Sequence, residues 1–284
     1  MKGLIVMKRF KLALQLYSVR DDMHRDFEGT LSRVKEMGYD GVEFVGEGEK
    51  YASLAGYKPE LVRDMCARIG LEPISVHVPF DCMVKHPDWT MDYYAAVGCK
   101  YIAIPYLTEE YRPGSDKFSE VIENAEALGR AAGFRGMKLL YHNHDFEFVK
   151  LGDRYALDVL YSDVPAEYLQ TEIDTCWVKV SDVDPSQYIL KYSGRAPVVH
   201  LKDYFGHKSA NMYKLIGMDD ASASEPSSFE FRPVGYGVQD FVSILNAAQQ
   251  AGSEWVVVEQ DDPSLGKTPM ECAQMSADYL KPIL

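Results

Sequence analysis

Two histidines that could bind a metal or transfer protons follow a short apolar run near the middle of the chain. The change from apolar to polar residues occurs within the segment Met137-Lys-Leu-Leu-Tyr-His142-Asn-His144-Asp-Phe-Glu147-Phe148. Because strand side chains alternate between two sides, His142 and His144 should face one pocket. Two imidazoles in one pocket suit metal binding or acid-base chemistry. A solvated turn with hydrogen-bonded histidines is the alternative interpretation.

Three later apolar runs also end in side chains that can bind a metal or exchange protons. Their last residues are Glu172-Ile-Asp174, His200-Leu-Lys202-Asp203 and Glu259-Gln-Asp261. Taken singly, each has a structural explanation: a capping aspartate, a buried histidine or an ion-paired glutamate. Their recurrence at successive strand ends instead predicts a divalent metal held by four side chains, namely His142, Asp174, His200 and Glu259.

The elements that must position these residues form a regular alternation along the 284 residues. Strands are expected at 11–17, 41–45, 73–78, 101–105, 138–142, 168–174, 197–201 and 254–259. Helices are expected at 27–37, 60–69, 88–97, 117–132, 155–161, 185–192, 239–251 and 268–279. Strand starts recur roughly every 30 residues, which predicts an α/β fold, the (β/α)8 TIM barrel, as a single domain over residues 1–284.

Two features of this alternation need separate interpretation. The last interval contains an insertion at about 204–236, which is polar and rich in turn residues, so it is expected to be a surface loop or lid. An open doubly wound sheet is the competing architecture. No Gly-x-Gly-x-x-Gly motif follows the first strand, where Leu14-Gln-Leu-Tyr-Ser18 stands instead, and this favours the barrel.

Composition and charge narrow the class of partner. The formal net charge of −13 opposes nucleic acid and anionic membrane surfaces, so a small, neutral or weakly charged ligand is expected. Five scattered cysteines without a Cys-x-x-Cys pair indicate neither a disulfide framework nor a zinc knuckle, and they favour a cytoplasmic protein. The apolar run at 4–7 is too short for a signal peptide, and no membrane-spanning run is expected. A homo-oligomer is compatible with the sequence.

The chain resembles the sugar phosphate isomerase/epimerase family in four motifs: Tyr-His-Asn-His-Asp-Phe-Glu-Phe at 141–148, Ile-Asp-Thr at 173–175, His-Leu-Lys-Asp at 200–203 and Val-Val-Val-Glu at 256–259. That family belongs to the xylose-isomerase-like TIM barrel superfamily, together with inosose dehydratases, ketose 3-epimerases and endonuclease IV. The resemblance covers essentially the whole chain. It implies a metal at the barrel mouth, with ligands from strands six, seven and eight at Asp174, His200 and Glu259.

The strand-five position departs from the ketose 3-epimerases, which place a glutamate where this chain has His142. In those enzymes two glutamates on strands five and eight exchange protons on opposite faces of the substrate, and this chain lacks one of them. One divalent metal ion is the expected cofactor. Mixed nitrogen and oxygen ligands suit manganese, zinc, cobalt or iron and do not choose among them. Two neutral imidazoles and two carboxylates neutralise the ion, which favours a stronger Lewis acid than three carboxylates would.

Candidate catalytic residues lie next to the predicted ligands. His144 is expected to act as general acid or base, Glu259 as both ligand and base, and Lys202 as a cation that stabilises an enolate oxygen. A structural histidine and a salt-bridged lysine are the alternatives. Substrate contacts are expected from side chains near other strand ends and loops, with packing or surface roles as the alternatives: Glu147, Trp177, His77, Tyr17 and Arg232.

These expectations favour a metal-dependent sugar isomerase or epimerase that removes an α-proton and forms an enediolate. The alternative is a lyase of the same superfamily, either a keto-inositol dehydratase or a 3-keto-glycoside eliminase. A lyase would begin with the same proton removal and then expel a β-substituent. The acidic charge opposes endonuclease activity, and a non-catalytic sugar-binding protein would leave the metal ligands without a role. The expected partner is therefore a small sugar or polyol, and the sequence leaves its phosphorylation open.

Overall fold

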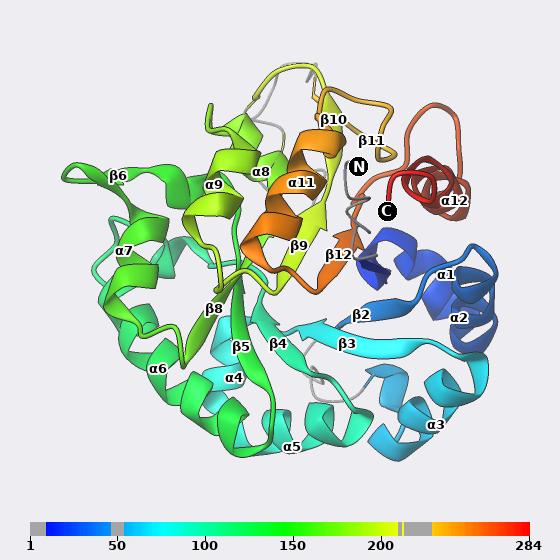
Figure 1. Ribbon diagram of the computed structural model, residues 1–284. Helices are drawn as coiled ribbons and strands as arrows, with labels where there is room; N and C mark the ends of the chain where they lie inside the picture. Colours follow the sequence, from blue (N-terminus) through cyan, green and yellow to red (C-terminus); the bar gives the residue numbers. More distant parts are fainter. Residues whose placement is uncertain (1–9, 47–53, 210–211, 213–228) are drawn as a thin grey trace, which may run out of the picture.

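The structure is a computed structural model that describes residues 10–46, 54–209, 212 and 229–284. Eight parallel strands close into a barrel in the order β1-β12-β9-β8-β5-β4-β3-β2, as Figure 1 shows. The barrel strands are β1 Lys11–Gln15, β2 Gly41–Val45, β3 Glu72–His77, β4 Tyr101–Ile104, β5 Lys138–His142, β8 Leu169–Asp174, β9 Val198–Leu201 and β12 Trp255–Val258. The predicted TIM barrel is therefore confirmed, and all eight predicted strands contribute to it.

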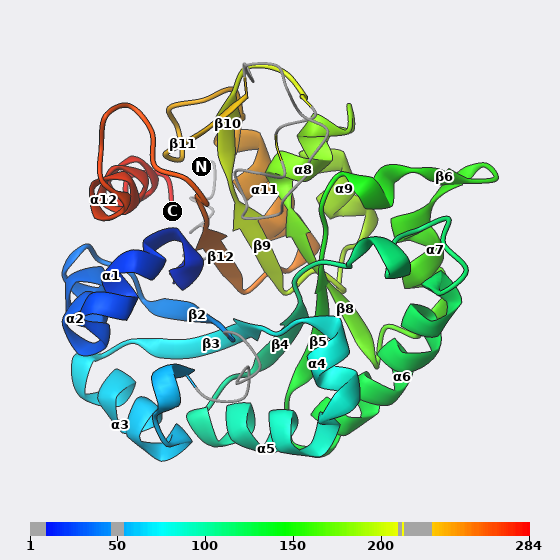
Figure 2. The same cartoon turned by 180° about the vertical axis from the view of Figure 1, so that it is seen from behind.

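Helices surround the barrel and bury its outer face (Figures 1 and 2). They are α1 Arg20–Arg25, α2 Phe27–Glu36, α3 Pro59–Ile69, α4 Phe80–Lys85, α5 Pro87–Val97, α6 Phe118–Phe134, α7 Ala156–Asp163, α8 Thr175–Val180, α9 Pro185–Lys191, α11 Phe241–Ala251 and α12 Pro269–Leu280. Helix α12 lies beside α1 in both views, so the ring closes where the last and first helices meet. Among the described residues, no helix is long and apolar enough to cross a membrane.

Local sequence explains where several helices begin and end. Thr268 starts α12 with a capping box, because its hydroxyl accepts from Glu271 N while the Glu271 carboxylate accepts from Thr268 N. Helices α3, α5 and α11 end at Gly70, Gly98 and Gly252, whose φ angles of 86°, 98° and 82° are left-handed. Glycine adopts this conformation without the steric cost of a Cβ atom.

The barrel interior has two layers that come from the same strands. The lower layer is apolar and consists of Ala13, Ile74, Tyr101, Ala103, Leu140, Val198, Trp255 and Val257. The upper layer is polar, lies toward the carboxyl ends of the strands and consists of Gln15, Glu43, His77, His142, Glu172, His200 and Glu259, all of them buried. Leu140 and His142, like Val257 and Glu259, are two residues apart, so strand alternation aims both members of each pair inward.

Two short hairpins leave the barrel at its loops. Strand β6 Lys150–Leu151 pairs with β7 Arg154–Tyr155, and β10 Asp203–Phe205 pairs with β11 Glu230–Arg232. The second hairpin begins one residue before the predicted insertion at 204–236, and residues 210–211 and 213–228 lie outside the described part of the chain. The prediction of a lid falls largely on those residues.

Candidate active site at the carboxyl ends of the strands

The four predicted metal ligands come together at the carboxyl end of the barrel. One donor atom from each of His142, Asp174, His200 and Glu259 lies within 4.8 Å of the others, and all four side chains are buried. His200 Nδ1 is hydrogen-bonded to Glu259 Oε2 at 2.8 Å. His142 Nε2 lies 3.6 Å from Asp174 Oδ2 and 3.9 Å from Glu259 Oε2. Side chains that are far apart in the chain thus form one compact donor set.

Asp174 shows that this donor set fits a divalent cation. Its Oδ1 accepts from the backbone N–H groups of Cys176 and Trp177 and so caps α8. Its Oδ2 is buried and makes no hydrogen bond within the described part of the chain. Burial raises the pKa of Asp174 to about 7. A cation at the cluster would offset the cost of burying this carboxylate, so the cluster can hold a metal ion.

Lys202 supplies a fixed positive charge beside the cluster. The residue is 1 % exposed, and its Nζ lies 2.5 Å from Asp261 Oδ2, 3.5 Å from Glu259 Oε2 and 3.7 Å from Asp174 Oδ2. Burial alone would lower the pKa of Lys202, but these three carboxylates raise it above its ordinary value. The ammonium group is therefore charged and held at the edge of the predicted metal site.

His144 packs between aromatic rings next to His142. The two histidine rings lie 5.4 Å apart, as predicted from their i and i+2 spacing. His144 stacks on Phe146 at 5.4 Å and lies 5.1 Å from Trp177. Burial lowers the pKa of His144 well below its usual range, and its Nδ1 makes no hydrogen bond among the described residues. This imidazole is consequently neutral and can accept a proton.

Glu147 and Arg232, two of the predicted substrate contacts, already have protein partners. Glu147 is buried, and its carboxylate accepts from Tyr141 Oη at 2.6 Å and from His144 N at 2.8 Å. Arg232 donates to Glu230 Oε2 at 2.9 Å. These contacts give both residues a structural role, and their roles in substrate binding stay predictions.

Tyr17 and His77 come from the carboxyl ends of β1 and β3. Tyr17 follows β1 in a 3-10 turn, Leu16–Val19, because the Gln15 side chain accepts from Tyr17 N and ends the strand; the predicted strand 11–17 was two residues too long. Burial chiefly raises the pKa of Tyr17, and the carboxylates of Asp261 and Glu259 add to the effect, so its hydroxyl is near the site. His77 lies within the upper layer and stacks on the ring of His200, with the ring centroids 5.4 Å apart.

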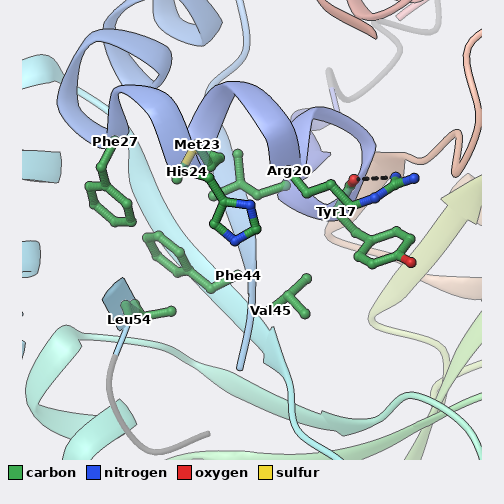
Figure 3. A pocket seen from close by; sticks show the side chains of 9 residues that line it. Tyr17, Arg20, Met23, His24, Phe27, Phe44, Val45 and Leu54 are labelled. Atoms are coloured by element: carbon green, nitrogen blue, oxygen red, sulfur yellow. Dashed lines mark hydrogen bonds between the residues drawn. The ribbon is translucent and has the colours of Figure 1, made fainter. Parts of the chain in front are cut away.

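A largely apolar pocket adjoins Tyr17 on the side of α1 and α2. Figure 3 shows Tyr17 and Arg20 at one end of this pocket and Phe27 and Leu54 at the other. Arg20 donates to the carbonyl oxygens of Tyr17 and Asp261, which ties the end of β1 to the residues after β12. Arg20 thus connects this pocket to the residues that follow β12.

Sequence reasoning gave no specific role to three buried carboxylates in this region. Glu43 lies beside His200 and Glu172 lies beside His77, and Asp261 pairs with Lys202. The signal that could have found Asp261 is its position two residues beyond Glu259, the same spacing that relates Lys202 to His200. A second group of possible metal donors consists of His77, His142, Glu172 and His200.

Comparison with known proteins places these features in a family. Residues 31–283 match the model of the xylose isomerase-like TIM barrel family. An inosose dehydratase from Clostridium beijerinckii is 24% identical over 275 residues, which are 90% of this chain and 89% of that protein.

Solved structures with the same fold include a sugar phosphate isomerase/epimerase from Parabacteroides distasonis, with a TM-score of 0.75 and 20% identity over 99% of this chain and 97% of that one. They also include the IOLI protein with a bound zinc atom, with a TM-score of 0.70 and 15% identity over 96% of this chain and 97% of that one. Because the family model matches most of its length, the chain belongs to the xylose isomerase-like TIM barrel family.

Proposed function

We propose that this protein is a metal-dependent enzyme that removes a proton next to the carbonyl group of a small sugar or polyol. The observation that carries the proposal is the buried donor set of His142, Asp174, His200 and Glu259, with a neutral His144 and a charged Lys202 beside it. Such a reaction requires a base, a cation and a metal site close together, and all three lie at one end of this barrel. One divalent ion of manganese, zinc, cobalt or iron is the proposed cofactor.

The proposed roles follow from the position of each side chain. A bound divalent ion would supply Lewis acidity that makes the α-proton of a carbonyl substrate more acidic. His144 would accept that proton, because its imidazole is neutral and its Nδ1 is free of hydrogen bonds within the described residues. Lys202 would hold negative charge that develops on a substrate oxygen. Phe146 and Trp177 pack against the ring of His144, which is buried.

Isomerisation or epimerisation through an enediolate is the first candidate reaction. The proton that His144 removes would return to a neighbouring carbon, or to the other face of the same carbon. The presence of His142 in place of a strand-five glutamate favours transfer by one base over exchange between two glutamates. The similarity of the fold to a sugar phosphate isomerase/epimerase supports this candidate.

Elimination of water or a glycosyl group is the second candidate, and a specific observation favours it. The inosose dehydratase relative aligns with 90% of this chain. After the same α-proton removal, the imidazolium of His144 would return its proton to the departing oxygen, and the ammonium group of Lys202 would stabilise the negative charge that develops on that oxygen. A single acid-base residue and a fixed cation beside it are compatible with this sequence of steps.

The experiment that tests the shared step uses ketoses, inososes and 3-keto glycosides in deuterium oxide. Isomerisation should place deuterium on a carbon next to the carbonyl, detected by proton NMR, whereas elimination should produce an enone or diketone chromophore. His144→Ala should slow either reaction by about 10²–10⁴-fold with its metal content unchanged. Absence of both exchange and elimination across these substrates would contradict the proposal.

A further inference from the structure

Two fully buried carboxylates lie beside the predicted metal ligands His142 and His200. Glu43 belongs to β2, and Glu172 belongs to β8, two residues before Asp174. His77 joins them, because its Nε2 lies 3.1 Å from Glu43 Oε1 and is hydrogen-bonded to Glu172 Oε2 at 2.7 Å. We call Glu43, His77 and Glu172 the inner triad. The triad contacts the donor set through His142 and His200.

The two nitrogens of His200 face these two groups separately. Nδ1 faces the donor set and lies 2.8 Å from Glu259 Oε2. Nε2 faces the inner triad and lies 2.9 Å from Glu43 Oε1 and 3.6 Å from Glu172 Oε2. Carboxylate oxygens lie beside both nitrogens of this buried ring. Because Glu259 is itself a predicted metal ligand, a cation at the donor set would displace the proton shared by Nδ1 and Glu259, and the remaining proton would lie on Nε2, beside Glu43. The lone pair of Nδ1 is then available to a metal ion.

His142 also lies between the donor set and the inner triad, but its Nε2 faces the donor set and its Nδ1 faces the triad, the reverse of His200. Its Nε2 faces Asp174 Oδ2 at 3.6 Å, and its Nδ1 lies 3.4 Å from Glu172 Oε2. The rings of His142 and His200 are 4.6 Å apart and inclined by 75°. His142 is thus oriented to bind a metal through Nε2 and His200 through Nδ1, from the strands β5 and β9 on either side of β8.

We propose that Glu43 and Glu172 are positioning residues that select these two metal-binding tautomers, with His77 holding the two carboxylates in place. The inference rests on the metal site of the proposed function. Gln15 adds a fixed contact, because its Nε2 donates to Glu43 Oε1 at 2.9 Å. Carboxylates that face the far nitrogen of a metal-binding histidine orient its ring and increase its basicity, and their loss typically costs about 10–100-fold in metal affinity.

An ion bound at the inner triad is the competing interpretation of the same atoms. His77, His142, Glu172 and His200 offer donors that could surround one. Such an ion would need His77 Nε2, which is already hydrogen-bonded to Glu172 Oε2. It would also use the nitrogens of His142 and His200 that face away from Asp174 and Glu259. This group contains one carboxylate, whereas the donor set of the proposed function contains two and neutralises a divalent ion, which favours a positioning role for the triad.

Zinc binding to metal-free protein tests the inference. Competition with a fluorescent chelator would give the zinc affinity, and elemental analysis would give the number of ions per chain. The variants are Glu43→Gln and Glu172→Gln, with Asp158→Asn as the matched control. Asp158 is a largely buried carboxylate outside the barrel that accepts from Tyr188 and Tyr192. Thermal unfolding of each metal-free variant would separate loss of the fold from loss of positioning.

The wild type should bind one zinc ion, and each glutamine variant should bind it about 10–100-fold more weakly, while Asp158→Asn keeps the wild-type affinity. Nitrogen-15 NMR of zinc-loaded protein labelled at histidine should show one ligand bound through Nδ1 and one through Nε2. Equal affinities in wild type and both glutamine variants would overturn the positioning role and leave the metal site standing. Two ions per chain, with one lost in Glu172→Gln, would instead identify a metal site at the inner triad. No zinc binding by the wild type would overturn both this inference and the metal dependence in the proposed function.

Discussion

The lower and upper layers of the barrel interior are built from the same strands, but the lower layer is apolar and the upper layer is polar and charged. The lower layer contains apolar side chains such as Leu140, Val198 and Val257, which stabilise the barrel by burial. Two residues further along the same strands, the upper layer contains His142, His200 and, just after β12, Glu259. Buried charges of this kind cost free energy unless they are paired or bind a cation. The apolar lower layer therefore stabilises the fold, whereas the buried charged groups of the upper layer reduce its stability and serve the reaction.

The largest expected effect comes from one carboxylate of the upper layer. Glu259→Gln should lower turnover by about 10²–10⁴-fold, because an amide cannot accept a proton and binds a cation more weakly. Activity assays would measure the loss, and circular dichroism should show the fold unchanged. Glu254→Gln is the matched control, since Glu254 is exposed and directly precedes the other end of the same strand. Wild-type turnover in Glu259→Gln would mean that this residue lies outside the reaction.

The reverse pattern is expected for the lower layer. Leu140→Ala should reduce the free energy of unfolding by about 2–5 kcal/mol, because it leaves a cavity at a fully buried position. Urea denaturation would measure this change. The variant should still bind its metal ion, whereas His142→Ala, two residues further on the same strand, should lose metal affinity. If Leu140→Ala lost the metal while remaining as stable as wild type, the division between the two layers would be wrong.

A smaller effect is expected at Glu147, which borders the upper layer. Burial raises its pKa to about 8, compared with an ordinary value of 4.5. Because the folded protein binds this proton more tightly than the unfolded chain, the contribution to stability is complete below about pH 4.5 and is lost as the pH rises through about 8. Glu147→Gln cannot titrate, so its stability should fall less than that of wild type across this range. Parallel slopes in urea denaturation at several pH values would contradict a raised pKa.

The order of strands in the chain allowed much of the barrel to be predicted. Apolar runs that recur at regular intervals gave the eight strands, and strand alternation placed His142 beside His144. The short helices α1, α4 and α8 were missed because six residues give too little periodicity to detect. The Trp255–Val258 strand was found because four apolar residues occur together.

Other parts of the site depend on barrel closure, which no local pattern records. His77 and Glu172 are hydrogen-bonded although they are 95 residues apart in the chain. Lys202 and Asp261 likewise meet only because β9 lies next to β12. A sequence pattern can indicate that a side chain points into the barrel, but the partner across the interior follows from the three-dimensional arrangement of the strands.

Metal content tests the central claim most directly. Elemental analysis of the purified wild type should find about one divalent transition metal ion per chain, and Asp174→Ala and His200→Ala should each lose it. Chelation of the wild type should abolish turnover, and added metal should restore it. A fully active, metal-free wild-type enzyme that is insensitive to chelators would contradict the account.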